Sequence, residues 1–166
     1  MTSYFAFETK AGWIALVGRD GKLIRSTLPK STREGALADV EAGLDADCVE
    51  DGSAFGDLPS RLIAYFAGQK VDFSDVDVDL GSPGRFIEAV QKACQNVSYG
   101  SLITYKGLAA AAGNARAARA AGTAMARNPV PIIVPCHRVV ASGGIGGFAL
   151  GLEWKRTLLR LEGVTI

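Results

Sequence analysis

The sequence predicts an α/β (α+β) protein, with a small antiparallel-sheet-plus-helix domain followed by a mostly helical domain. Strand-like alternation fills the first 30 residues, whereas helix-like periodicity prevails after residue 85. The charge also changes sign, because residues 1–80 carry 8 Lys and Arg against 14 Asp and Glu, and residues 81–166 carry 10 against 3. Loop-forming residues cluster at 81–84, so we place the domain boundary there.

The first domain is expected to contain strands at 3–9, 12–20 and 21–29, helices at 31–43 and 58–69, and a strand at 71–80. Asp20-Gly21 between the second and third strands is a strong hairpin signal. Ser31 or Thr32 is expected to cap the first helix. The last segment alternates with period two, which predicts a strand with one acidic face.

The second domain is expected to contain helices at 85–97, 104–113 and 115–128, a strand-like segment at 129–135, a glycine-rich loop at 142–151 and a helix at 152–163. The two helices around Gly113-Asn114 match the helix-turn-helix pattern. Cys94 lies on the apolar side of the first of these helices and is expected in the core.

Several classes of protein are disfavoured by the sequence. It has neither a secretory signal at its start nor a run of ~18 apolar residues that could span a membrane. The three cysteines, Cys48, Cys94 and Cys136, are widely spaced, and His137 is the only histidine. We therefore expect free thiols in a reducing cytoplasm, with no metal and no cofactor.

The helix expected at 115–128 consists mostly of Ala and Gly, with three arginines. Arg116 and Arg119 are three residues apart and are expected to share a face, with Arg127 two turns further on. Either the small residues permit close helix packing, or a bare surface lets the helix approach DNA while the arginines meet phosphates. No acidic residue between Glu88 and Glu153 opposes the second interpretation.

The segment PVPIIVPCHRVV places Cys136 directly before His137. The pair is either structural, with both side chains in the core, or a nucleophile next to its base. The second interpretation requires a turn at Pro135 and a carboxylate that orients the imidazole. Glu162, which follows apolar residues near the end of the last helix, is the candidate for that carboxylate.

The stretch from Ser98 to Gly144, which includes NPVPIIVPCHRVV, resembles the O6-alkylguanine-DNA alkyltransferases without a gap. GLEWKRTLLRLEG, at 151–163, resembles the closing helix of that family. The resemblance implies a winged-helix-like domain for DNA binding and alkyl transfer at 81–166, with its active-site loop. It implies a supporting, ribonuclease-H-like domain at 1–80, where only the order of elements is similar.

The resemblance also implies the roles of single residues in the chemistry. Cys136 takes the alkyl group from O6 of guanine, His137 removes the thiol proton through a water, and Glu162 orients the imidazole. Asn128 ties the recognition helix to the active-site turn. The base pocket is expected to be formed by Tyr105, Val139, Phe148 and Ala149.

The recognition helix is expected to enter the minor groove of double-stranded DNA. Arg119 would fill the space left when the damaged nucleotide is flipped out, which is required for chemistry on a base. The residues expected to contact DNA are Tyr105, Arg116, Arg119, Ala120, Ala121 and Thr123. We expect a cytoplasmic monomer, nucleoid-associated when bound to DNA, with cooperativity on DNA left open.

The expected function is stoichiometric transfer of an alkyl group from O6-alkylguanine, with O4-alkylthymine left open as a substrate. The pocket loop departs from the usual pattern of the family, because it has Phe148, Ala149 and Leu150 in place of a Tyr, a small residue and a Gly. Two other hypotheses are a sensor that binds alkylguanine without transfer, and a cysteine hydrolase. The reactive cysteine argues against the non-enzymatic relatives of the family, which lack it.

Overall fold

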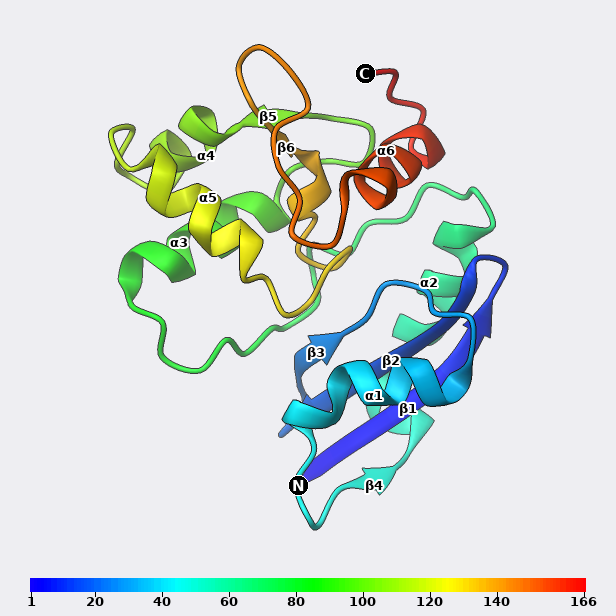
Figure 1. Cartoon of the computed structure of the whole chain (residues 1–166). Coiled ribbons are helices and arrows are strands. Elements are labelled where there is room, and N and C mark those ends of the chain that lie inside the picture. Colours follow the sequence, from blue (N-terminus) through cyan, green and yellow to red (C-terminus); the bar gives the residue numbers. More distant parts are fainter. The chain divides into compact units, whose positions relative to one another are not determined.

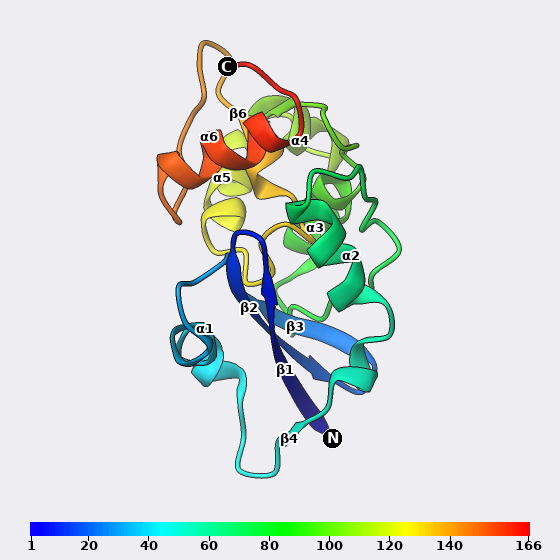
Figure 2. The same ribbon diagram turned by 90° about the vertical axis from the view of Figure 1, so that its right-hand side faces the viewer.

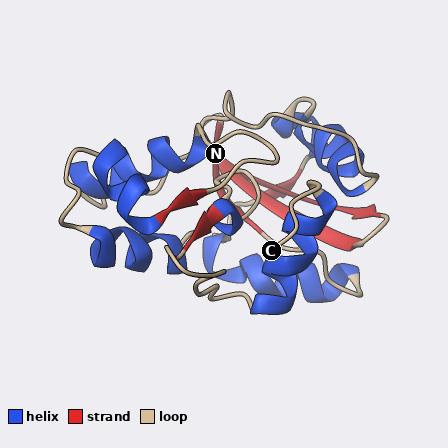
Figure 3. Cartoon of the chain, turned by 90° about the horizontal axis from the view of Figure 1, so that it is seen from above, coloured by secondary structure: helices blue, strands red, loops and turns tan.

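The computed structural model describes every residue from Met1 to Ile166, and the chain divides into two compact units. Unit 1 comprises residues 1–71 and 75–80, and unit 2 comprises residues 72–74 and 81–166. Unit 1 contains a four-stranded sheet and unit 2 is mostly helical (Figures 1 and 3), which confirms the predicted α+β class. None of the helices has the length and apolar character that a membrane crossing demands.

The sheet of unit 1 has the order β3-β2-β1-β4. Its strands are β1 (Thr2–Thr9), β2 (Gly12–Arg19), β3 (Lys22–Ser26) and β4 (Val49–Glu50). The pairs β1–β2 and β2–β3 are antiparallel, whereas β4 pairs with β1 in parallel. The hairpin predicted at Asp20-Gly21 is confirmed, and both residues have positive φ (52° and 79°), as a two-residue type I′ turn requires.

Helices α1 (Arg33–Val40) and α2 (Leu58–Phe66) cover opposite faces of this sheet (Figure 2). Strand β2 is therefore buried on both sides, which explains why residues 14–17 are all fully buried and apolar. Thr32 is the cap of α1, since its Oγ1 accepts a hydrogen bond of 3.0 Å from the N–H of Gly35. The short 3-10 helices η1 (Glu41–Gly43) and η2 (Gly52–Phe55) flank β4.

The strand predicted at 71–80 is wrong. Only Val78 forms a bridge to the sheet, at Leu23, where two backbone hydrogen bonds of 2.9 Å join Leu23 to Asp77 and Asp79. At the start of the segment, Oδ1 of Asp72 accepts a 2.8 Å hydrogen bond from the N–H of Ser74. Such Asp turns compete with strand pairing for backbone N–H groups, so alternation alone misled the prediction here.

Unit 2 is built on helices α3 (Arg85–Gln95), α4 (Tyr105–Ala111), α5 (Ala118–Ala126) and α6 (Leu152–Leu161). Helices α4 and α5 pack on each other and on α3, and Gly113 (φ 102°) lies in the turn between them. Cys94 is fully buried, as predicted. Two short strands, β5 (Ile103–Thr104) and β6 (Val139–Val140), pair in parallel. Strand β5 leads into α4, and β6 follows directly after the 3-10 helix η3 (Cys136–Arg138).

The strand-like segment predicted at 129–135 is also wrong. It turns back on itself, since the N–H of Val134 donates to the carbonyl of Val130 (3.0 Å) and Ile132 has a positive φ of 74°. Three prolines in this segment lack the N–H that a sheet ladder needs, so the apolar run cannot pair as a strand. The turn leads directly into η3, where Cys136 is the first residue.

Candidate active site

Asn128 connects the end of α5 to the active-site turn. Its Nδ2 donates hydrogen bonds to the carbonyl of Val134 (2.8 Å) and to Sγ of Cys136 (3.2 Å), and its Oδ1 accepts one from the N–H of Val130 (3.1 Å). One short side chain thus fixes both the turn and the thiol.

Cys136 is buried at one wall of a cavity of about 130 Å³. The other lining residues are Tyr105, Gly122, Met125, Ala126, Gly147, Phe148 and Ala149. Burial raises the pKa of the thiol, although the hydrogen bond from Asn128 and the positive charge of Lys155 act in the opposite direction. The resting thiol is therefore protonated at neutral pH and needs a base before it can act as a nucleophile.

His137 and Glu162 lie in contact in the interior, with 2.5 Å between Nε2 and Oε2. Burial lowers the pKa of His137 despite the adjacent carboxylate, so the imidazole is neutral. With Nε2–H donating to the carboxylate, Nδ1 carries the lone pair and is the basic nitrogen. Nδ1 is buried and has no hydrogen-bond partner within the protein.

Arg138 also bonds Glu162, a contact that the sequence pattern does not predict. Its Nε and Nη2 donate to the two carboxylate oxygens (2.8 and 3.1 Å), and the N–H of Gly100 adds a third hydrogen bond of 3.0 Å. Burial acts to raise the pKa of Glu162, but the hydrogen bonds from His137 and Arg138 outweigh it and lower the pKa to about 2. The carboxylate is therefore ionised and fixed.

Lys155 is a second buried charged residue in this region that was not among the predicted site residues. It is fully buried on the inner face of α6, at the helical spacing of Leu158, Leu159 and Glu162. That spacing on an otherwise apolar face was the signal available in the sequence. Its Nζ donates hydrogen bonds to the carbonyl of Val139 (2.7 Å) and to that of Gly147 (2.8 Å), which lines the cavity.

The predicted pocket residues are only partly brought together. Tyr105, Phe148 and Ala149 line the cavity with Cys136, and the hydroxyl of Tyr105 donates to the carbonyl of Gly147 (3.2 Å). Val139 does not line it, because this residue is fully buried in β6 and its carbonyl accepts a hydrogen bond from Lys155.

The glycine-rich loop approaches the cavity very closely. A Cβ atom on Gly146 would lie 2.9 Å from the ring of Tyr105 and 3.0 Å from the backbone N of Ala141, and its φ is 74°. Glycine is therefore required at this position both by space and by backbone conformation.

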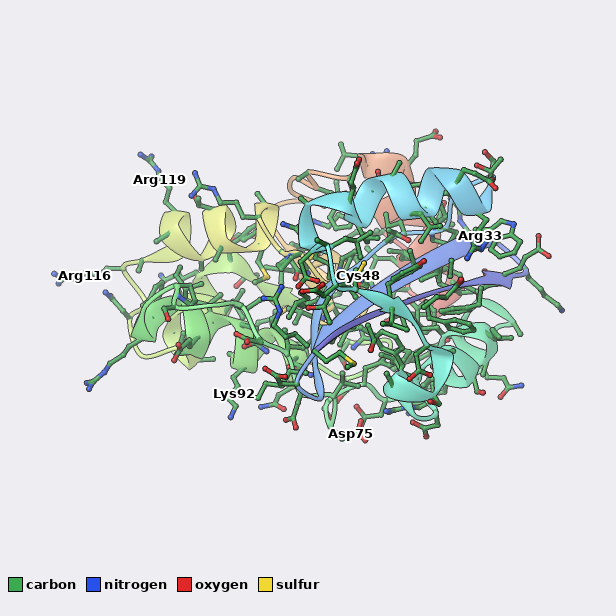
Figure 4. The ribbon with its side chains drawn as sticks, turned by 90° about the horizontal axis from the view of Figure 1, so that it is seen from below. Arg33, Cys48, Asp75, Lys92, Arg116 and Arg119 are labelled. Atoms are coloured by element: carbon green, nitrogen blue, oxygen red, sulfur yellow. The ribbon has the colours of Figure 1, made fainter.

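The predicted DNA-contact residues fall into two groups. Arg119, Ala120 and Thr123 are exposed on one face of α5, and Figure 4 shows the side chain of Arg119 extending outward. Ala121 is fully buried, so its expected contact with DNA is wrong. The helical periodicity of α5 turns this position toward the core rather than toward solvent.

The placement of Arg116 on the recognition helix is wrong as well. The helix begins at Ala118, and Arg116 lies in the preceding turn, where its N–H donates to Oδ1 of Asn114 (3.1 Å). Arg116 remains exposed and points away from the ribbon (Figure 4), but it does not share a helical face with Arg119. The Asn114 side chain bonds the backbone of this turn, and the helix begins three residues later than the alanine-rich pattern indicated.

The structure contains no group of three or more His, Cys, Asp and Glu side chains that could hold a metal ion. The chemically active side chains are a thiol, an imidazole, two cations and one carboxylate. This set can deliver a nucleophile and remove its proton.

Residues 85–164 match the family model of the 6-O-methylguanine DNA methyltransferase DNA-binding domain. The chain is 35% identical over 166 residues to the methylated-DNA–protein-cysteine methyltransferase of Metallosphaera sedula, an alignment that covers all of this chain and 96% of the relative. It is 42% identical over 161 residues to that of Methanosarcina barkeri, with 96% of each chain covered.

Solved structures agree with these relatives. OGT of Mycobacterium tuberculosis in complex with DNA superimposes with a TM-score of 0.76 at 32% identity, covering 97% of this chain and 93% of OGT. The O6-methylguanine-DNA methyltransferase of Pyrococcus kodakaraensis gives a TM-score of 0.75 at 30% identity, covering 99% of this chain and all of the other. Similarity of this identity and coverage establishes that the chain belongs to the methylated-DNA–protein-cysteine methyltransferase family.

Proposed function

We propose that the protein repairs DNA by direct reversal, moving the alkyl group of O6-alkylguanine onto Cys136 in a single, irreversible turnover. One observation carries this proposal: Cys136 lines a cavity, while its neighbour His137 is held by Glu162 through Nε2 and keeps Nδ1 free of protein partners. A water between Nδ1 and the thiol would complete the path for the proton.

The reaction balances without a cofactor. The thiolate sulfur forms a bond to the alkyl carbon as the bond from that carbon to O6 breaks, and the purine recovers a proton at N1 to become guanine. The thioether product is a poor leaving group, and no second thiol lines the cavity. One molecule of protein is therefore consumed for each lesion.

DNA is the partner of this family's DNA-binding domain, and the finer geometry is part of our proposal. The exposed face of α5 enters the minor groove, where Ala120 permits close approach, and Arg119 fills the stack from which the lesion is flipped. Tyr105, Phe148 and Ala149 receive the extruded base. The protein acts as a monomer on chromosomal DNA, so it works in the cytoplasm and on the nucleoid.

The two units have different roles in this proposal. Residues 81–166 perform DNA binding and alkyl transfer, and residues 1–80 support them. The ribonuclease-H-like character expected of residues 1–80, and repair of O4-alkylthymine, stay predictions.

The test is mass spectrometry of the intact protein and its peptides after incubation with a duplex that contains one O6-methylguanine. We expect one added methyl group on the Cys136 peptide, saturating at one per protein and absent in Cys136→Ser. Tight binding to the lesion without added mass would refute transfer and favour a lesion sensor. Repeated turnover on acyl substrates would indicate a hydrolase instead.

A further inference from the structure

The segment between α3 and β5 makes a tight turn at Tyr99-Gly100. The N–H of Ser101 donates to the carbonyl of Ser98 (3.0 Å), and Gly100, the third of these four residues, has a φ of 77°. A positive φ at the third position is the mark of a type II turn, which favours glycine there. The backbone alone therefore gives residue 100 a reason to be glycine.

The type of this turn decides where one N–H group points. Between type I and type II turns, the peptide that joins the second and third residues is rotated by roughly half a turn. Here that peptide joins Tyr99 to Gly100, and its N–H donates to Oε1 of Glu162 (3.0 Å). A residue that favours negative φ at position 100 would shift the turn toward type I and aim this N–H away from the carboxylate. A Cβ on Gly100 would also lie 3.3 Å from the carbonyl oxygen of Glu162.

The Tyr99 side chain holds the end of the helix that carries Glu162. Its hydroxyl donates to the carbonyl of Leu161 (3.2 Å), in the last turn of α6, where carbonyls lack a partner within the helix. Its ring lies 5.9 Å from the guanidinium of Arg138, which also donates to the carbonyl of Val97 (2.6 Å). Residues 97–100 therefore contact both the carboxylate and the arginine that pairs with it.

These contacts fix the rotation of the Glu162 carboxylate. Oε1 accepts hydrogen bonds from Nε of Arg138 and from the N–H of Gly100. Oε2 accepts one from Nη2 of Arg138 and lies against Nε2 of His137. Two donors on Oε1 leave Oε2 as the oxygen presented to the imidazole. The proton of neutral His137 is therefore held on Nε2, and Nδ1 keeps the lone pair.

We propose that Tyr99 and Gly100 are positioning residues for alkyl transfer: their turn orients Glu162 and, through it, selects the tautomer of His137 that can accept the thiol proton. Neither residue lines the cavity, so the turn acts through the carboxylate and not on the substrate. This inference deepens the proposed function and rests on it, but its first readout needs no DNA.

The single histidine of the chain makes the tautomer directly observable. Proton–nitrogen correlation NMR of histidine-labelled protein shows which ring nitrogen carries the proton, and the spectrum contains one imidazole. In wild type we expect only the Nε2–H form at neutral pH. In Gly100→Ala an Nδ1–H form should appear, because the carboxylate no longer holds one orientation. Single-turnover transfer from O6-methylguanine should slow about tenfold, which is part of the ~10²–10⁴-fold that a general base contributes.

Gly68→Ala is the matched control for backbone strain. Gly68 also has a positive φ (92°), but a Cβ there would meet open space, and the residue lies after α2 in unit 1. This variant should lose a similar amount of stability to denaturant and keep the wild-type tautomer and transfer rate. Gly100→Asn should recover part of the rate, because Asn adopts positive φ more readily than Ala.

Tyr99→Leu tests the same turn without a change at the glycine, since it removes the hydroxyl and the ring together. We expect slower transfer and the same new tautomer. Tyr99→Phe, which keeps the ring beside Arg138, should restore part of both.

The wild-type tautomer in folded Gly100→Ala or, if that variant does not fold, in Tyr99→Leu would overturn the inference. Failure of the proposed function looks different, because the tautomer would then still respond to Gly100→Ala while wild type takes no methyl group from DNA.

Discussion

The two units bury different kinds of polar groups. Those of unit 1 are hydroxyls, namely Thr2, Thr9, Ser26 and Thr27. Those of unit 2 are one amide, one imidazole and three charged groups, namely Gln95, His137, Arg138, Lys155 and Glu162. Neutral hydroxyls can be satisfied by one backbone contact, such as the 3.1 Å hydrogen bond from the N–H of Ala15 to Thr27. Buried charges cost more and demand partners, so unit 2 gives up stability to hold reactive groups in place.

The largest expected effect comes from removing the charge of Glu162. In Glu162→Gln the buried guanidinium of Arg138 loses its anion, so we expect the free energy of unfolding to fall by about 3–5 kcal/mol. Transfer from O6-methylguanine should slow by roughly a hundredfold or more, because His137 loses its orientation. Denaturant unfolding and single-turnover assays measure the two losses. Glu153→Gln, an exposed change on the same helix, is the control and should do neither.

A substitution that creates a cavity in the core of unit 1 should lower the stability of the protein without slowing alkyl transfer. Leu16 is fully buried in β2, and Leu16→Ala is expected to cost about 2–5 kcal/mol. The single-turnover rate of the folded fraction should stay within twofold of wild type. A large loss of transfer rate in fully folded Leu16→Ala would show that the core of unit 1 also affects the chemistry of unit 2.

Acid should weaken unit 2 first. The pKa of Glu162 is lowered to about 2, so its stabilisation is complete above its ordinary pKa of about 4.3 and is lost as the pH falls toward 2. The pKa of His137 is also lowered, so the unfolded chain takes up that proton first and stability already falls below about pH 6.5.

Tryptophan fluorescence can report the acid unfolding of each unit separately, since Trp13 lies in unit 1 and Trp154 in unit 2. In single-tryptophan variants, the acid transition reported by Trp154 should occur at a higher pH than that reported by Trp13. Coincident transitions would mean that the chain unfolds as one cooperative body, and the contrast in buried charge would then have no local consequence.

The smallest effect is expected from a matched pair of helix caps. Thr32 and Thr104 each accept a 3.0 Å hydrogen bond from the backbone of the helix that follows. Thr32→Ala and Thr104→Ala should each cost about 1 kcal/mol. Only Thr104→Ala should also slow transfer, by several fold, because α4 begins with Tyr105 at the cavity. Equal effects on transfer would argue against this distinction.

Local patterns made much of the fold predictable. The Asp20-Gly21 hairpin and the apolar face of α3 both depend on neighbours in the sequence, and both are confirmed. The segments at 71–80 and 129–135 were assigned wrongly, because Asp72 and the prolines take away the backbone N–H groups that strands require. The contact between His137 and Glu162 could be anticipated because acidic residues are scarce in this half of the chain.

The buried hydrogen bonds of Lys155 and Arg138 could not be predicted from local sequence patterns. The spacing of Lys155 places it on the apolar face of the last helix, but only the fold shows that Val139 and Gly147 accept its hydrogen bonds. The burial of Ala121 likewise depends on how α5 is rotated against its neighbours, which a run of alanines does not specify.

The long sequence separation of the contacts made by Glu162 has a consequence for biosynthesis. Glu162 bonds residues that lie 24, 25 and 62 positions earlier in the chain. The ribosome therefore makes the thiol and its imidazole before the carboxylate that orients them. A nascent chain that has passed Cys136 but not Glu162 lacks the carboxylate that orients His137, and the active site is complete only when residue 162 has emerged and α6 has docked.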